Sequence, residues 1–147
     1  MRDSDLAGSV GVMTLRCLIV DDSPTFVAAA RSLLERQGMT VLGVASSGAE
    51  ALRMATELHP DVVLVDIDLG EESGLELAKR LDRSTTSPPA VILISTHAED
   101  DYSDLLAENP AIGFVPKTVL SAAAIRRLLD GRGADTPARP VAGPPER

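Results

Sequence analysis

Several side chains that could take part in phosphoryl chemistry come at the ends of separate apolar runs. They are Asp21 and Asp22 after the first run, Asp66 and Ser95 at the ends of later runs, and Lys117 shortly after the last. Each residue alone is as well explained by a solvated turn, a helix cap or a surface position. Their shared placement at the ends of different runs is the strongest functional signal in the chain.

Together these residue types fit metal-assisted phosphoryl transfer. Clustered carboxylates raise one another's pKa unless a cation compensates their charge. Mg²⁺ is a hard ion that accepts one or two carboxylates together with waters and a phosphoryl oxygen. Lys117 would supply positive charge to a phosphoryl group, and Ser95 a hydrogen bond. An aspartate such as Asp66 can act as the nucleophile toward phosphorus and form an acyl phosphate.

Five apolar strands, alternating with helices, are predicted to carry these residues. The strands are expected at residues 16–21, 40–45, 61–66, 90–95 and 111–115. Their runs are apolar on consecutive positions, which is typical of strands buried on both faces of a parallel sheet. Ligands of such sheets lie beyond the carboxyl ends of the strands. The candidate residues should therefore meet at one edge of the sheet.

Helix signals fill the gaps between the strands. Ser23 and Pro24 are predicted to open a first helix that ends at Gly38. A capping box at Ser47 and Glu50 is predicted to open a second helix that runs to about residue 58. Further helices are expected around residues 75–81, within 100–108 and over 120–130. We therefore predict an α/β fold: a five-stranded, parallel, doubly wound sheet with five helices.

Composition narrows the classes of function. The 147 residues carry a formal net charge of −8, and only 2% of them are aromatic. An acidic chain with few aromatics suits neither phosphate-backbone binding nor base stacking, so no direct nucleic-acid ligand is expected. Cys17 is the single cysteine and is predicted to be a buried, inert thiol. Without a signal peptide or a bilayer-length apolar run, we expect a cytoplasmic protein with no membrane contact.

Four segments and their spacing resemble the receiver domain of two-component response regulators. The segments are LIVDDSP, PDVVLVDIDLGEESGLE, VILIST and GFVPK; 44 positions separate Asp22 from Asp66, 29 separate Asp66 from Ser95, and 22 separate Ser95 from Lys117. The resemblance covers residues 15–130. It implies a flavodoxin-like sheet of strand order 2-1-3-4-5. It leaves residues 1–14 as a disordered extension and 131–147 as a proline- and glycine-rich disordered tail.

By this resemblance each candidate residue acquires a role. Asp66 would be the phosphoacceptor, and Mg²⁺ would be held by Asp21, Asp22, Asp66 and the backbone carbonyl of Asp68. Ser95 would be the hydroxyl that moves toward the phosphoryl group, and Lys117 would pair with that group. Phe114 stands at the family's aromatic switch position, where the ring rotates inward on activation.

Some residues depart from the family pattern. Thr118 follows Lys117 where a proline is usual, and a cis bond there would cost about 2.5–4 kcal/mol without proline. Gly70 stands where the family often has a proline, and Thr96 stands where a small residue is common. Phe114 lacks the hydroxyl of the more common tyrosine. None of these changes removes a reacting group.

Three other classes of protein share parts of this pattern. Haloacid-dehalogenase-type phosphatases also use a D-x-D strand, a Ser or Thr and a lysine, as in Asp66-Ile67-Asp68, Ser95 and Lys117. Their D-x-D strand usually opens the domain, however, and an acidic pair follows the lysine. A pseudo-receiver would not need the complete residue set, and Ser46-Ser47-Gly48 is a poor phosphate loop for a P-loop or dinucleotide binder.

We therefore expect a stand-alone response regulator, with a fragment of a longer regulator that carries an output domain as the alternative. A sensor histidine kinase or phosphotransfer protein would phosphorylate Asp66, so the protein would be a phosphoprotein of a two-component system or phosphorelay. It would not be an enzyme beyond self-phosphorylation and autodephosphorylation. Its signal would pass through a surface of the fourth helix, fifth strand and fifth helix, to an unknown protein target or a homodimer.

Overall fold

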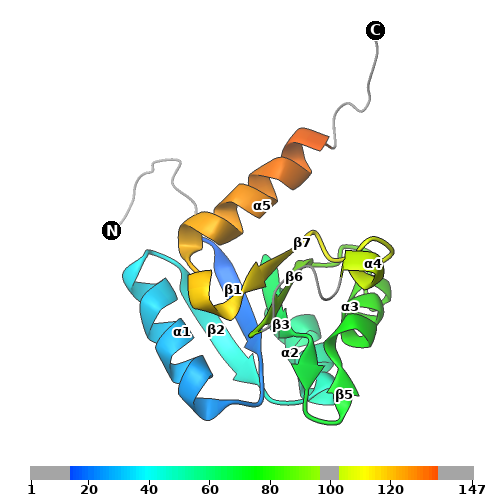
Figure 1. The fold of residues 1–147 in the computed structure, drawn as a ribbon, viewed down its shortest axis with the longest axis horizontal. Helices are drawn as coiled ribbons and strands as arrows, with labels where there is room; N and C mark the ends of the chain where they lie inside the picture. Colours follow the sequence, from blue (N-terminus) through cyan, green and yellow to red (C-terminus); the bar gives the residue numbers. More distant parts are fainter. Residues whose placement is uncertain (1–13, 97–102, 136–147) are drawn as a thin grey trace, which may run out of the picture.

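A five-stranded parallel sheet forms the centre of the structure, a computed structural model that describes residues 14–96 and 103–135 (Figure 1). The strands are β1 (Arg16–Val20), β2 (Thr40–Ala45), β3 (Val62–Asp66), β6 (Ala90–Ser95) and β7 (Gly113–Pro116), in the order β2-β1-β3-β6-β7. All four pairings are parallel. The predicted α/β fold and its 2-1-3-4-5 strand order are thereby confirmed.

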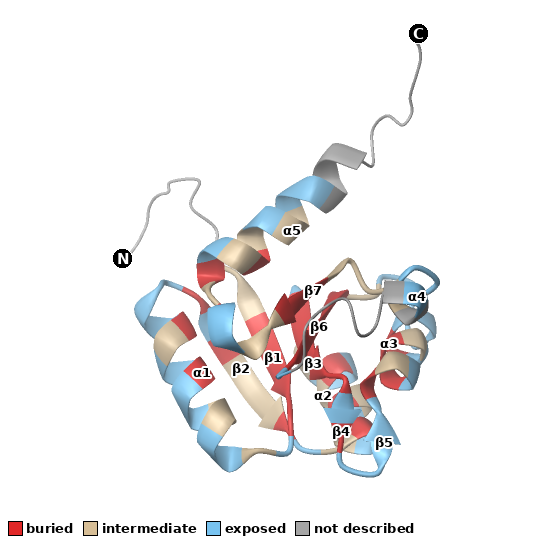
Figure 2. Ribbon diagram, in the orientation of Figure 1, coloured by how far each residue is buried: buried red, intermediate tan, exposed pale blue. Residues whose placement is uncertain are grey.

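The apolar runs make these strands because consecutive side chains point to opposite faces of a sheet and both faces are covered. Every residue of β3 and β6 is buried (Figure 2). On one face, Ile19 and Leu64 pack with residues of α1 (Pro24–Arg36) and α5 (Ala122–Asp135). On the other, Val20 and Leu93 pack with residues of α2 (Gly48–Leu58) and α3 (Gly74–Arg83).

The helices begin where the capping signals indicate. Ser23 caps α1 by accepting a hydrogen bond from the Phe26 N–H, with Pro24 as the first helical residue. Ser47 caps α2 in the same way, and Ser73 caps α3. The helix α2 ends at His59, whose φ of 50° is left-handed. Two short helical segments, α4 (Ser103–Leu106) and the 3₁₀ turn η3 (Lys117–Val119), complete the described elements.

The last strand lies at residues 113–116 instead of the expected 111–115, and two larger features also differ from the sequence-based expectations. The helix α5 continues to Asp135, so the predicted end at Asp130 is wrong by five residues. Each glycine there costs a helix about 1 kcal/mol relative to alanine, which an established helix tolerates, and the first proline comes only at Pro137. The second is a hairpin of β4 (Asp68–Leu69) and β5 (Glu72–Ser73), whose two-residue strands are too short to give a pattern.

The predicted domain limits remain predictions. Residues 1–13 of the expected extension, 136–147 of the expected tail and 100–102 of the expected fourth helix lie outside the described residues. Within the described residues, no helix is both long and apolar enough to span a membrane.

A substitution at Gly74, the first residue of α3, would test how tightly this helix is packed against the end of β3. A Cβ at this position would overlap the backbone carbonyl of Asp66. We expect Gly74→Ala to lower the free energy of unfolding by about 1–3 kcal/mol, the usual cost of overpacking. Urea denaturation measures the change.

Gly131→Ala is the matched control for this prediction. Gly131 lies in α5 with no heavy atom within 4 Å of an added Cβ. The substitution should therefore stabilise the protein by about 0.5–1 kcal/mol through helix propensity alone. Equal effects of the two substitutions would contradict the close packing of α3 on β3.

Candidate functional site

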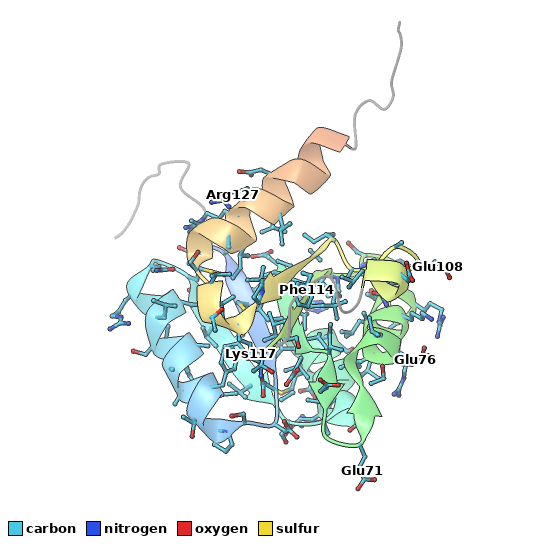
Figure 3. The ribbon with its side chains drawn as sticks, viewed as in Figure 1. Glu71, Glu76, Glu108, Phe114, Lys117 and Arg127 are labelled. Carbon is cyan, nitrogen blue, oxygen red and sulfur yellow. The ribbon has the colours of Figure 1, made fainter. Side chains whose placement is uncertain are left out.

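The carboxyl ends of the central strands bring the predicted reactive residues to one edge of the sheet. Asp21 directly follows β1, Asp66 and Ser95 end β3 and β6, and Lys117 directly follows β7. The strand order reverses direction between β1 and β3, and such a switch point is where doubly wound sheets bind ligands. Figure 3 shows Lys117 at this part of the domain.

Three carboxylates form a cluster at this edge. One oxygen each from Asp21, Asp22 and Asp66 lies within 4.8 Å of the other two. Asp21 and Asp66 are buried, whereas Asp22 is exposed. Backbone donors orient the two buried groups: the Ser23 N–H donates to Asp21 Oδ1 at 2.8 Å, and the Asp68 N–H donates to Asp66 Oδ1 at 3.0 Å. The cluster is therefore preorganised and acidic.

Lys117 bridges the two buried carboxylates. Its Nζ lies 2.7 Å from Asp21 Oδ2 and 3.1 Å from Asp66 Oδ2. The same ammonium lies over the Phe26 ring, 4.4 Å from the ring centroid, in a cation–π contact. The sequence did not indicate this role of Phe26, since the contact joins residues far apart in the chain. The peptide bond that follows Lys117 is trans, because the described residues contain no cis bond.

Burial and charge act against each other at this edge. Burial raises the pKa of the Asp66 carboxyl above its ordinary value of 3.8, and the charge of Asp21 adds to the rise. The hydrogen bonds from Lys117 and from the Asp68 N–H oppose it. Burial alone would lower the pKa of Lys117, but its contacts with Asp21 and Asp66 outweigh burial and raise that pKa. The two carboxylates therefore keep Lys117 in its ammonium form.

The donor set fits a hard divalent cation. Asp21 Oδ2 is buried and accepts no well-directed hydrogen bond, so its short contact with Lys117 is an ion pair that leaves lone pairs unused. One ammonium faces three carboxylates, and all the clustered ligand atoms are oxygens. Such a set attracts a cation of the Mg²⁺ type, which prefers oxygen ligands and keeps several of its waters.

The other predicted site residues lie on β6, β7 and β4. Ser95 is buried at the end of β6, where it is paired in register with Pro116. Phe114 is also buried, in the core between the sheet and the helices α2 and α3. Asp68 is exposed on β4, and its N–H contacts the cluster by donating to Asp66 Oδ1. The metal contact expected from its carbonyl oxygen stays a prediction.

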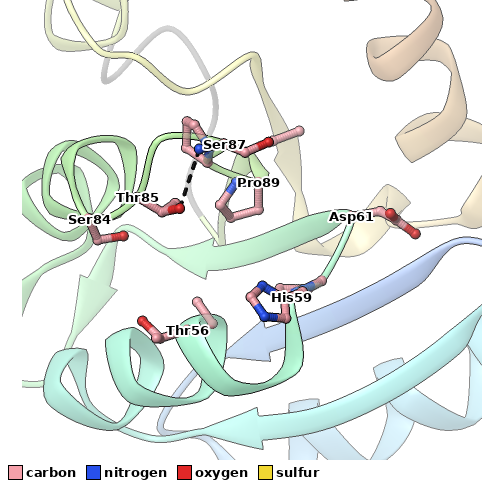
Figure 4. Close-up of a pocket in the computed structure, with 11 residues that line it drawn as sticks. Thr56, His59, Asp61, Ser84, Thr85, Ser87 and Pro89 are labelled. Carbon is pink, nitrogen blue, oxygen red and sulfur yellow. Dashed lines mark hydrogen bonds between the residues drawn. The ribbon is translucent and has the colours of Figure 1, made fainter.

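Two cavities differ in their position relative to the acidic cluster. One of about 570 Å³ opens beside Asp21 and Asp22, with Val27 and Val44 as apolar wall and Arg31 among its charged residues. A second, of about 480 Å³, is lined by residues such as Thr56, His59 and Ser84 (Figure 4). It adjoins the amino ends of β3 and β6, at the opposite edge of the sheet, and contains none of the predicted site residues.

Fold and site together define a flavodoxin-like domain with a lysine-paired acidic cluster at the carboxyl edge of its sheet. The chain belongs to the response regulator receiver domain family, whose model matches residues 17–129. Receiver domains are phosphoacceptor switches of two-component signal transduction. The haloacid-dehalogenase interpretation is not supported, since the matched family covers all of the residues on which that interpretation rested.

Two curated relatives illustrate the match. The chain is 38% identical over 101 residues to a protein-glutamate methylesterase/protein-glutamine glutaminase of Hahella chejuensis, covering 68% of this chain and 29% of the relative. It is 33% identical over 105 residues to the transcriptional regulatory protein LiaR of Bacillus subtilis, covering 71% and 49%. The chain thus spans less than half the length of either relative.

A solved structure shows the same fold. The signal receiver domain of a modulated diguanylate cyclase from Desulfovibrio desulfuricans superposes with a TM-score of 0.67 at 31% identity, over 81% of this chain and 93% of that one. The likeness therefore extends over nearly the whole of that receiver domain.

The raised pKa of Asp66 predicts a pH dependence of stability. Between the ordinary carboxyl pKa of 3.8 and the higher pKa in the folded protein, the folded state keeps a proton that the unfolded state has lost. Stability should therefore fall as the pH rises through this window, by at most about 1.4 kcal/mol per pH unit. Asp66→Asn should remove this fall and be more stable than the wild type above the window.

Urea denaturation of the metal-free protein across this range of pH measures the effect. Asp130→Asn, an exposed change on α5, is the control and should follow the wild-type profile. If Asp66→Asn also follows the wild-type profile, the burial of an ionised Asp66 has no energetic cost and the interpretation is wrong.

The bridging ammonium of Lys117 predicts a large loss of stability when it is removed. Lys117→Met leaves two buried carboxylates without their shared counter-charge, and we expect the free energy of unfolding to fall by about 3 kcal/mol at neutral pH. Added Mg²⁺ should restore part of this loss, because it neutralises the same oxygens.

Lys79→Met is the control for this measurement by urea denaturation. Lys79 also makes an ion pair, with Glu76 at 3.3 Å, but both side chains are exposed. The control should change stability by less than about 0.5 kcal/mol. A similar small effect of Lys117→Met would show that the bridge does not stabilise the site.

Proposed function

We propose that this receiver domain accepts a phosphoryl group on Asp66, in the presence of Mg²⁺, from the phosphohistidine of a sensor histidine kinase or phosphotransfer protein. The observation that carries the proposal is the position of Asp66: a buried carboxylate at a strand end, paired with Lys117 and clustered with Asp21 and Asp22. The opening beside Asp22 supports access by a partner to this edge of the sheet.

Each residue of the site has a defined task in this reaction. An Asp66 carboxylate oxygen forms a bond to phosphorus while the bond from phosphorus to the histidine nitrogen breaks, and the electron pair stays on the imidazole. Asp21, Asp22, Asp66 and the Asp68 carbonyl would hold the cation. Bound Mg²⁺ supplies charge that offsets the phosphoryl and carboxylate oxygens.

Lys117 changes its partner in the course of the reaction. Its ammonium lies 3.1 Å from Asp66 Oδ2, so it can pass from the carboxylate to an oxygen of the phosphoryl group without crossing the site. The ion pair with Asp21 holds the ammonium in place meanwhile, and the Phe26 ring limits its movement on the other side. Lys117 therefore positions the phosphoryl group and stabilises its charge.

The output would follow from the added charge. Ser95, buried at the end of β6, would hydrogen-bond the phosphoryl group, and Phe114 on the neighbouring β7 would respond to the shift. The surface of α4, β7 and α5 would then bind a target protein or a second copy. In this proposal the domain catalyses only its own phosphorylation and dephosphorylation. The stand-alone role and the cytoplasmic location stay predictions.

Incubation with acetyl phosphate tests the phosphorylation directly. With Mg²⁺ present, the intact mass of the protein should increase by one phosphoryl group. The increase should vanish in Asp66→Asn and with excess chelator, because each removes an essential part of the site.

Asp104→Asn, on the exposed start of α4, serves as the control and should be phosphorylated like the wild type. No increase in the wild type, or an increase that persists in Asp66→Asn, would overturn the proposed function. Continuous release of phosphate from a small phosphomonoester would instead indicate a phosphatase.

A further inference from the structure

We propose that Glu72 is a positioning residue of the phosphorylation site, which anchors the β4–β5 hairpin on the amino end of α2. Glu72 Oε1 accepts a hydrogen bond from the Gly48 N–H at 2.9 Å, between residues 24 positions apart. This inference rests on the proposed function and deepens it. It assigns to an acidic side chain outside the carboxylate cluster the task of holding the loop that follows Asp66.

The amino end of α2 needs a hydrogen-bond acceptor, which Glu72 supplies. The first turn of a helix leaves backbone N–H groups without helical partners. At α2 the Glu50 N–H is bound by the Ser47 hydroxyl, and the side chain of Glu50 binds the Ser46 N–H. Neither of these local caps binds the N–H of Gly48, which is a buried residue. That N–H donates to Glu72 instead. A carboxylate also suits the positive end of the helix dipole.

The absence of a side chain at Gly48 leaves room for this contact. A Cβ at Gly48 would overlap Glu72 Oε1, while its other near neighbours lie at an ordinary 3.6 Å. The carboxylate thus occupies the space that any larger residue would fill. Because it is the end of a flexible side chain, an added methyl group would displace it without disturbing the backbone of α2.

The hairpin that Glu72 holds makes one hydrogen bond to the acidic cluster and passes close to it at its turn. The Asp68 N–H donates to Asp66 Oδ1 at 3.0 Å. At the turn, Gly70 has a φ of 63°, and an added Cβ there would lie only 3.2 Å from Asp22 Oδ2. Glu72 itself is paired with Leu69, which is buried. The anchor, the hydrogen bond to Asp66 and the turn beside Asp22 therefore belong to one short element.

Such an element is not stable alone. Two strands of two residues each cannot hold a hairpin in water without other contacts. Attached to α2, the hairpin is already ordered before a cation or a phosphoryl group arrives, so binding need not pay for that ordering. Without the anchor, the cluster would bind Mg²⁺ more weakly, while the reacting groups themselves would be unchanged.

Four variants separate this role from charge and from fold stability. Glu72→Ala removes the acceptor and the charge, whereas Glu72→Gln removes only the charge. Gly48→Ala displaces an intact Glu72. Glu71→Ala is the control, since it removes the same charge from the neighbouring residue, whose side chain points away from the domain in Figure 3.

Mg²⁺ affinity and phosphorylation are measured on the same samples. Mg²⁺ binding is followed by ¹H–¹⁵N NMR, and phosphorylation by acetyl phosphate from the intact mass, at low and at saturating Mg²⁺. We expect Glu72→Ala and Gly48→Ala to weaken Mg²⁺ binding about fivefold, the usual effect of losing one hydrogen bond. Both should be phosphorylated more slowly at low Mg²⁺ but at nearly the wild-type rate at saturation. Glu72→Gln and Glu71→Ala should stay within about twofold of the wild type.

The alternatives give different results. Equal weakening by Glu72→Gln and Glu72→Ala would show a charge effect and overturn the anchor. A lower melting temperature with unchanged Mg²⁺ affinity would show a role in stability alone and also overturn it. If the wild type binds Mg²⁺ but is not phosphorylated, the proposed function fails while the anchor is still tested by Mg²⁺ affinity and by the Gly48 amide resonance of the metal-free variants.

Discussion

The repulsion among three carboxylates at one edge of the sheet is the constraint on which the rest of the structure depends. Asp21 and Asp66 are buried within reach of each other, and a single ammonium, that of Lys117, lies against both. Buried charges of like sign are costly unless they are paired. The site therefore carries excess negative charge, which a divalent cation would reduce and the proposed phosphoryl group would redistribute.

The fold tolerates the electrostatic cost of this cluster because its central strands are held in position by packing on both faces. The residues of β3 and β6 are buried throughout, with apolar side chains packed against helices on both faces. Interiors of this density respond to a local change by shifting between discrete packings and do not deform smoothly. A charge added at Asp66 therefore acts on the ends of rigid strands, and the neighbouring loops must absorb the change.

Much of this arrangement could be predicted from the sequence. Consecutive apolar residues and helix caps give the sheet and the first three helices, because burial on both faces and N-cap chemistry leave local signatures. The meeting of Asp21, Asp66 and Lys117 follows from parallel strands that end at one edge. The end of α5 did not follow, since Gly131 weakens a helix without ending it. Nor did the contacts of Phe26 and Glu72, because each joins residues far apart in the sequence.

These distant contacts surround the acidic cluster with elements of unequal stability. Lys117 is fixed by two carboxylates and an aromatic ring, and it follows β7 in the core. The hairpin after Asp66 has only two-residue strands and is tied to α2 by one side chain. A phosphoryl group on Asp66, as proposed, would enlarge this side chain and disturb its hydrogen bond from the Asp68 N–H. The hairpin has shorter strands than any strand of the central sheet, so it should adjust before the sheet does.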